Sequence, residues 1–160
     1  MKSIDEIIQE HGPRVSAYVR SMVRDKSMVD DLVQETFIRV WRYMSSYRGE
    51  GSFQSWIISI AHNVVMSAMA KKIDVPTSEL QTPSTNDVYE DIDFVSVVAQ
   101  LPIEQRQAVS LCLVMGFSYQ EAADIVKVPI GTIRSRVSRG RDSLREILVD
   151  TGQAGMRIAQ

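Results

Sequence analysis

A stretch rich in proline, serine, threonine and asparagine, VPTSELQTPSTNDVYED, interrupts the sequence at residues 75–91. It lacks helical periodicity, and this composition is typical of a linker. On both sides apolar residues recur at helical spacing, and no strand pattern competes with it. We therefore predict an all-α protein with two small helical domains, at 1–72 and 97–150, joined by a flexible acidic linker at 73–96 and followed by a flexible tail at 151–160.

The first half contains a strong amphipathic pattern in SMVDDLVQETFIRVWRYM. Its apolar residues follow the three- and four-residue spacing that lines one buried face of a helix. Ser27 is a candidate N-cap, with Asp30 at the reciprocal capping position. The polar residues that fall on the outer face include Asp31, Gln34 and Glu35.

Three further helices are expected in the first half. After the glycine-containing break YRGEG, a long helix is predicted from about residue 53 to residue 72, with Ser52 as its cap. Shorter helices are predicted at 3–11 and 13–24. Together they would make a compact four-helix domain.

The second half predicts a helix-turn-helix. In FSYQEAADIV, Ser118 and Glu121 have the spacing of a capping box. After a short turn, Pro129 opens the longer stretch PIGTIRSRVSRGRDSLREIL. A short helix, a tight turn and a longer helix form this motif. The apolar stripe expected on the second helix consists of Ile133, Val137, Leu144 and Leu148.

Positive charge is concentrated on that second helix, although the chain has a formal net charge of −2. Residues 127–145 hold six basic side chains and one acidic one, whereas residues 73–105 hold seven acidic side chains and no lysine or arginine. A helix with one apolar face and arginines around the rest suits the major groove of DNA. A solvated basic face is the alternative, and the preceding capped helix and turn favour DNA binding. Gly140 would permit a bend or a close backbone approach, or would simply be tolerated.

Several classes of protein are disfavoured. No apolar run approaches the ~20 residues that cross a bilayer, and the N-terminus lacks the pattern of a signal peptide. One cysteine, Cys112, and two distant histidines make a poor metal site. An enzyme would need a metal on Asp30, Asp31 and Glu35, and the sequence offers no nucleophile, phosphate loop or histidine pair beside them. We expect a soluble cytoplasmic protein with no cofactor.

Three stretches carry a resemblance to a known family: DDLVQETFIRVWR, GSFQSWIISIAHN and LPIEQRQAVSLCLVMGFSYQEAADIVKVPIGTIRSRVSRGRDSLRE. Found in this order, on the two sides of a linker, the three stretches together are a highly specific signature of one family. Over roughly residues 5–150 the sequence resembles a bacterial RNA polymerase sigma factor of the extracytoplasmic-function (ECF) group of the sigma-70 family. The resemblance implies sigma domain 2 at 1–72, sigma domain 4 at about 97–150, and no domain 3. It implies a promoter-specificity subunit without catalytic activity.

The resemblance also implies roles for individual residues. The helix face with Asp31, Gln34 and Glu35 would dock on the clamp helices of the largest subunit of core RNA polymerase. An ordinary solvated face is the alternative for these residues. The positions implied for binding the −10 promoter element are Tyr47, Phe53, Trp56, His62 and Asn63, of which Trp56 could equally be a core residue. Those implied for the −35 element are Thr132, Arg134, Ser135, Ser138 and Arg139.

The sequence departs from the family pattern in AHNVVMSAMAKK. His62 stands where arginine is usual, Ser67 where aspartate is common and Ala68 where a basic residue is frequent. Fewer phosphate contacts are expected there. Lys127 stands where relatives often carry a turn glycine, so it would adopt a left-handed conformation unless the turn differs.

The family implies an anti-sigma factor as regulator, in addition to core RNA polymerase and promoter DNA. Two other interpretations remain: a sigma-like decoy that binds an anti-sigma factor without promoter activity, and a stand-alone helix-turn-helix repressor. The acidic linker would either mimic RNA charge in a polymerase channel or act as a tether.

Overall fold

The computed structural model describes residues 2–73 and 93–150, and all regular elements in these ranges are helical. The prediction of an all-α fold with two helical domains is confirmed. The predicted tail and most of the predicted linker lie outside the described residues, although the linker's last residues begin α4. The helices are α1 (Ile4–Met22), α2 (Val29–Tyr43), α3 (Phe53–Ile73), α4 (Phe94–Val98), α5 (Ile103–Val109), α6 (Tyr119–Val126) and α7 (Ile130–Asp150). Shorter turns cover Lys26–Met28, Met44–Ser46 and the π-helical Ser110–Val114.

Helix α1 is continuous where the sequence predicts two helices. Ser3 and Glu6 form a capping box at its start, and Pro13 lies inside it. A proline in a helix removes one backbone hydrogen bond and crowds the preceding residue. That residue is Gly12, whose missing β-carbon relieves part of the crowding. The prediction of separate helices at 3–11 and 13–24, and of a four-helix first domain, is therefore wrong.

Helices α2 and α3 pack on α1 with the predicted apolar faces inward. Ser52 Oγ accepts a hydrogen bond from the Ser55 amide at 3.0 Å, so the predicted cap of α3 is confirmed. The predicted cap of α2 is wrong. Ser27 instead donates from its hydroxyl to Asp25 Oδ1 at 2.6 Å, and Met28, at the N-cap of α2, makes no side-chain capping hydrogen bond. Asp25, two residues upstream, already accepts from the Ser27 amide and so starts the chain turning first.

The helix-turn-helix forms as predicted. The capping box of Ser118 and Glu121 starts α6, and Lys127 ends it in the left-handed conformation with φ 65°. The carbonyl of Pro129 accepts from the Thr132 and Ile133 amides and so starts α7. The predicted apolar stripe of α7 is buried, and Gly140 is buried with it.

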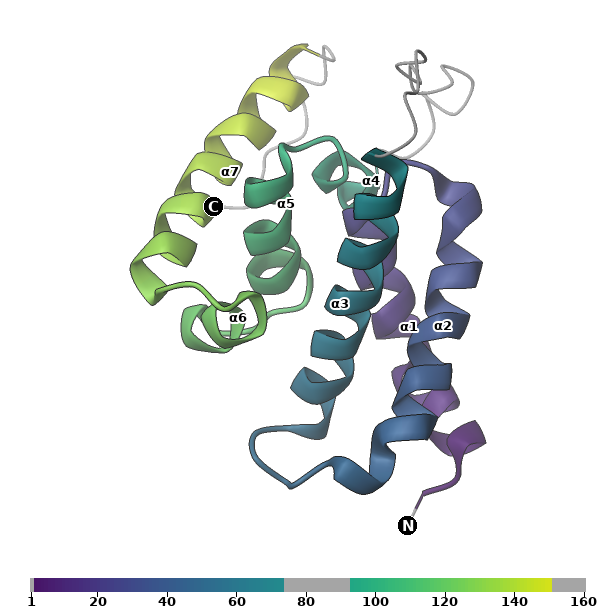
Figure 1. The fold of residues 1–160 in the computed structure, drawn as a ribbon. Coiled ribbons are helices and arrows are strands. Elements are labelled where there is room, and N and C mark those ends of the chain that lie inside the picture. The colour runs from purple at the N-terminus through teal and green to yellow at the C-terminus, as the bar shows by residue number, and fades with distance from the viewer. Residues whose placement is uncertain (1, 74–92, 151–160) are drawn as a thin grey trace.

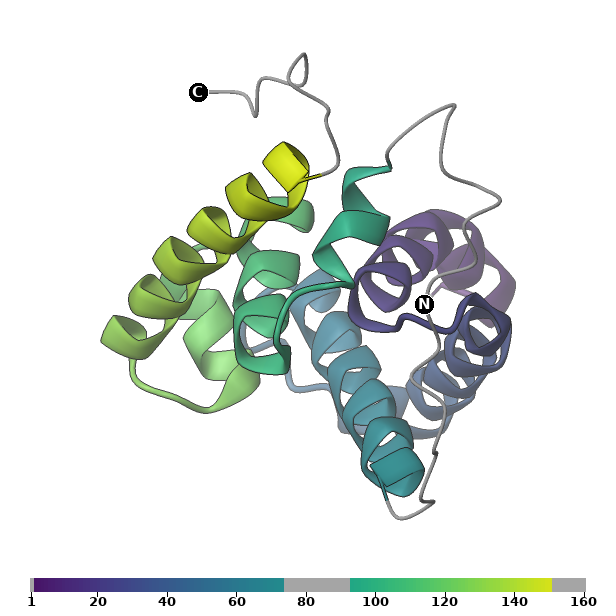
Figure 2. The ribbon, with the colours of Figure 1, turned by 90° about the horizontal axis from the view of Figure 1, so that it is seen from above.

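The two halves of the chain pack against each other, which the sequence did not predict. In Figure 1, α3 lies between the first two helices on one side and α6 on the other. Figure 2 shows α4 close to α1 at the same boundary. One hydrophobic core continues from one half into the other. Its buried members include Val15, Tyr18, Ile58, Ala61, Ala108, Leu111, Ala122 and Ile133.

Candidate functional site

The exposed surface of α7 carries the residues predicted to contact the −35 element. Arg134, Ser135, Ser138 and Arg139 are exposed, and Thr132 is half-buried near the helix start. The opposite face is buried against the rest of the second half. The helix is therefore held by one side and presents its first turns, with their arginines and serines, to the surroundings.

Helix α6 positions the first of these arginines. The guanidinium carbon of Arg134 lies 6.0 Å from the centre of the Tyr119 ring, which is within the range of a cation–π interaction. Tyr119 is the first residue of α6 after its cap. The sequence analysis did not identify Tyr119, although an aromatic residue at the start of the first helix of this motif was a visible signal.

Three aromatic side chains predicted at the −10 site gather at the start of α3. The ring centres of Tyr47 and Phe53 are 5.2 Å apart, those of Tyr47 and Trp56 are 5.2 Å apart, and those of Phe53 and Trp56 are 5.5 Å apart. The Tyr47 hydroxyl donates to the Gly51 carbonyl at 2.9 Å and ties the loop to this cluster. All three side chains are half-buried, so each retains some accessible surface.

His11 of α1 also belongs to this aromatic cluster. Its ring stands edge-on to Phe53 with centres 5.6 Å apart. The sequence analysis missed His11, because its distance along the chain from Phe53 leaves no local pattern. The contact braces Phe53 from the α1 side.

The remaining two predicted −10 residues face different environments. Asn63 is exposed, whereas His62 is 7% exposed and therefore buried. His62 Nδ1 lies 2.9 Å from the Tyr18 hydroxyl. Burial, with a smaller contribution from the charge of Lys127, lowers the pKa of His62 below its ordinary value of 6.5. Lys127 ends α6, so His62 lies at the boundary between the two halves.

The outer face of α2 carries the residues predicted to dock on polymerase. Asp31 and Gln34 are exposed, and Glu35 is partly exposed and paired with Arg39 at 3.0 Å. Ile38 is 49% exposed and Trp41 is 66% exposed on the same arc of the helix. Exposed large apolar side chains next to polar ones are typical of a protein-binding surface. Sequence analysis missed the two apolar members, because it assigned only polar residues to the outer face.

Residues 2–73 and 93–150 show no sign of a metal site, an activated cysteine or a membrane-spanning helix. No three His, Cys, Asp or Glu side chains in these ranges gather as a possible metal site. Burial raises the pKa of Cys112 to about 11, which leaves its thiol a poor nucleophile at neutral pH. None of the described helices has the length and apolar character that a membrane span requires.

Comparison with protein families gives two matches in the order of the two halves. Residues 7–72 match sigma-70 region 2, and residues 92–144 match sigma-70 region 4. The ECF RNA polymerase sigma factor EcfG of Rhodopseudomonas palustris is 32% identical over 148 residues, which cover 88% of this chain and 82% of that protein. The ECF RNA polymerase sigma factor SigE of Mycolicibacterium smegmatis is 32% identical over 92% of this chain, and the match spans 62% of that longer protein.

Two solved structures share the fold of this chain. The co-crystal structure of the sigma factor RpoE with the anti-sigma factor NepR from Bartonella quintana matches with a TM-score of 0.78 and 29% identity, covering 92% of this chain and 98% of that one. The fold is also similar to that of CnrH in complex with the cytosolic domain of CnrY, with a TM-score of 0.67 at 21% identity over 92% of this chain and 88% of that one. With both regions matched in order and the helix-turn-helix in place, the chain belongs to the extracytoplasmic-function sigma factors of the sigma-70 family, which are not enzymes.

Proposed function

We propose that this ECF sigma factor binds core RNA polymerase, directs it to promoters with specific −35 and −10 elements, and helps to open the DNA for initiation. In this division of labour the first half, residues 1–72, binds polymerase and the −10 element. The second half, residues 97–150, binds the −35 element. We place this activity in the cytoplasm, where sigma factors generally work.

The observation that carries the proposal is the way α7 is packed against the rest of the protein. Its apolar stripe is buried, while Arg134, Ser138 and Arg139 remain exposed. An α-helix fits the major groove, and arginine binds guanine through two hydrogen bonds at its edge. Serine hydroxyls are short and donate to phosphate oxygens or bases. The start of α7 is thus equipped to read a sequence in duplex DNA.

The aromatic cluster of Tyr47, Phe53 and Trp56 supports a role at the −10 element. Unpaired bases stack on aromatic rings, and this stacking offsets the cost of taking a base out of the duplex. Asn63, exposed on α3, adds an amide that hydrogen-bonds to a base or a phosphate. His62 stands beside it in sequence, and its burial leaves Asn63 as the more accessible polar group.

The outer face of α2 supports docking on polymerase. Its carboxylates and amide suit a basic partner helix, and Ile38 and Trp41 supply apolar area next to them. We assign the clamp helices of the largest polymerase subunit as the partner. An anti-sigma factor is proposed as the regulator, because the RpoE structure that matches this chain is a complex with the anti-sigma factor NepR.

Transcription with purified components tests the proposal. The chain is mixed with core polymerase and a library of promoter fragments, and the transcripts are sequenced. Specific initiation is expected. Replacing Arg134 and Arg139 with alanine should reduce promoter binding at least ~10-fold, because a bidentate arginine contact is worth about 1–3 kcal/mol. Binding to core polymerase should be unchanged.

Arg141→Ala with Arg145→Ala is the matched control, because it removes the same two charges from the same helix at exposed positions farther from its start. It should weaken promoter binding much less. Unchanged promoter binding in the Arg134→Ala, Arg139→Ala protein would show that the reading helix is wrongly assigned. Binding to an anti-sigma factor without any transcripts would favour the decoy instead.

A further inference from the structure

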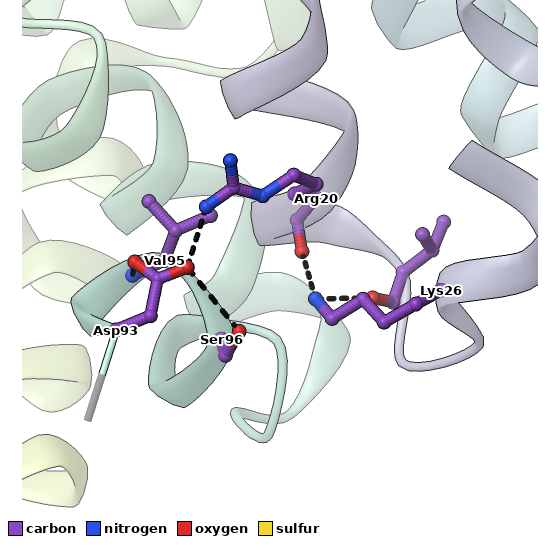
Figure 3. Close-up of polar contacts among 6 residues, drawn as sticks. Arg20, Lys26, Asp93, Val95 and Ser96 are labelled. Carbon is purple, nitrogen blue, oxygen red and sulfur yellow. Dashed lines mark hydrogen bonds and ion pairs between the residues drawn. The ribbon is translucent and has the colours of Figure 1, made fainter. Parts of the chain in front are cut away.

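The exposed guanidinium of Arg134 is held by an aromatic ring rather than by an anion. Its central carbon lies over the Tyr119 ring, 6.0 Å from the ring centre. Arg20 shows the other way of holding an arginine: in Figure 3 it points to Asp93, the residue that caps α4, and the two side chains form an ion pair. Within residues 2–73 and 93–150, no carboxylate forms an ion pair with Arg134.

An aromatic ring orients a guanidinium without occupying its hydrogen-bond donors. The guanidinium is planar and its five N–H groups lie in that plane, whereas the ring attracts the cation through the face of its π-system. A carboxylate would instead bind the N–H groups in the bidentate manner that a guanine edge also requires. Arg134, held over Tyr119, therefore keeps its donors available for DNA.

The Tyr119 ring is itself fixed in place by the start of α6 and by the core. The Ser118 amide donates to Glu121 Oε1 at 3.0 Å, and the Glu121 amide donates to Ser118 Oγ at 3.1 Å. These two bonds hold the turn of backbone that carries Tyr119. The Tyr119 side chain is half-buried and packs against the hydrophobic core. The ring is therefore a platform of defined position.

The turn between α6 and α7 fixes the backbone of Arg134 relative to that ring. Lys127 ends α6 in the left-handed conformation, and the Val128 amide donates to the Ala123 carbonyl at 3.1 Å. Ile133, directly before Arg134, is fully buried. In Figure 1, α6 lies beside the beginning of α7. The backbone at Arg134 is thus set, and the ring limits the orientations of its long side chain.

We propose that Tyr119 is a positioning residue for recognition of the −35 element: its ring orients the Arg134 guanidinium and so sets how strongly this arginine discriminates between bases. The inference rests on the proposed function and adds to it a residue of α6 that acts through another side chain. An arginine loses rotamer freedom when it binds, and an arginine that is already restricted loses less. A cation–π contact at an exposed site corresponds to about a 2- to 5-fold effect on an equilibrium.

Nuclear magnetic resonance of the free full-length chain tests the contact without DNA. The Nε–Hε signal of Arg134, identified by its absence in Arg134→Ala, should be shifted upfield by the ring current of Tyr119. Tyr119→Leu should remove this shift, and Tyr119→Phe should retain it. An Arg134 signal at the same position in the parent and in Tyr119→Leu means that the contact does not form in solution, and the inference is then wrong.

The effect on recognition is measured with the complete holoenzyme. Core polymerase and each variant transcribe a library of promoters with randomised −35 elements, each linked to a transcribed barcode, and sequencing gives the base preference at every position. Arg134→Ala should abolish the preference at one position. Tyr119→Leu should weaken the preference at that same position by about 2- to 5-fold. Combined with Arg134→Ala, it should add nothing, because the two side chains act as one unit.

Two further variants separate positioning from other roles. Tyr119→Phe keeps the ring and should keep the base preference; a loss equal to that of Tyr119→Leu would mean that the hydroxyl acts through its own contact with DNA, which contradicts the inference. Phe117→Leu is the matched control, because Phe117 is also a half-buried aromatic residue packed on the same core. It should leave the preference unchanged. An equal weakening in Phe117→Leu would show that general destabilisation is the cause and would overturn the positioning role.

Failure of the proposed function gives a different result from failure of this inference. If Arg134→Ala changes the base preference at no position of the −35 element, α7 does not read that element as proposed, and the inference is wrong with it. If Arg134→Ala abolishes a preference that Tyr119→Leu leaves intact, the proposed function stands and only the positioning role of Tyr119 is refuted.

Discussion

Gly140 lies where α7 passes close to α5. A β-carbon added at this position would clash with Val109 Cγ2 and would lie 3.7 Å from Gln105 Cβ. Nearby, Ser143 Oγ donates to Gln105 Oε1 at 2.7 Å and fixes the same crossing. Glycine usually costs a helix about 1 kcal/mol relative to alanine. Here that cost permits α7 to lie directly against α5, so of the alternatives left open by the sequence the structure supports the close backbone approach.

We therefore expect Gly140→Ala to lower the free energy of unfolding by about 1–3 kcal/mol, because overpacking outweighs the gain in helix propensity. Chemical denaturation measures this change. Gly131→Ala, in the same helix, meets nothing within 4 Å and should be neutral or slightly stabilising. Adding Val109→Ala to Gly140→Ala removes the clashing methyl group and should recover part of the loss. A Gly140→Ala protein as stable as the parent would contradict the close approach.

Among the elements, α2 has one buried face and one outer face that carries exposed apolar side chains. Thr36, Phe37 and Val40 are buried, while Ile38 and Trp41 on the other side are exposed. An apolar outer face costs solubility unless a partner covers it. We expect the polar members of that face to determine which partner is accepted, because charge complementarity governs specificity more than affinity.

Asp31→Lys should weaken binding to core polymerase at least ~10-fold, because it places a cation where a basic partner helix is proposed to dock. Asp5→Lys is the matched control. It makes the same charge change in an exposed first turn, but on α1 and therefore away from the outer face of α2. Both reversals carry the same cost against the helix dipole, so their stabilities should be similar. Equal loss of polymerase affinity in the two proteins would mean that general charge, rather than this face, is responsible.

The sequence correctly predicted those features whose residues lie close together along the chain. The capping box of Ser118 and Glu121, and the Ser52 cap, involve residues three apart, so their chemistry is visible in a short window. The errors have the same origin. Ser27 was outcompeted by Asp25, an equally good acceptor just upstream. Pro13 was tolerated because of Gly12 and the packing around α1, which a pattern of residue types does not contain.

At the scale of the whole molecule, no sequence pattern predicts that the two halves pack against each other. Arg14 and Met115 are separated by 101 residues, and the acceptor is a backbone carbonyl that every residue possesses. His62 shows the consequence for the site. The resemblance implied that it contacts DNA, whereas it is buried, lies 2.9 Å from the Tyr18 hydroxyl of α1 and is close enough to Lys127 for that charge to affect its pKa. The sequence identified candidate residues for a DNA-binding surface, but their accessibility depends on how the halves are placed.

We expect His62 to make the stability of the fold sensitive to pH. Burial and the charge of Lys127 lower the pKa of His62 below 6.5, so the packed protein binds fewer protons than the unfolded chain as the pH falls through 6.5. The stabilising contribution is therefore complete above this pH and is lost below it. The groups that face the imidazole are the Tyr18 hydroxyl, whose pKa burial raises, and the Lys127 ammonium. Neither provides a negative charge to accept a histidine cation.

The thermal unfolding midpoint should fall when the pH is lowered from about 7.5 to about 5.5, on either side of the ordinary histidine pKa of 6.5. Part of this fall should disappear in His62→Gln, which cannot be protonated, and His11 is retained in both proteins as an internal control. Lys127→Asn should reduce the fall as well, because it removes the neighbouring cation while asparagine tolerates the left-handed conformation. If the midpoints of the parent and His62→Gln follow the same pH curve, His62 is not enclosed between the halves in solution.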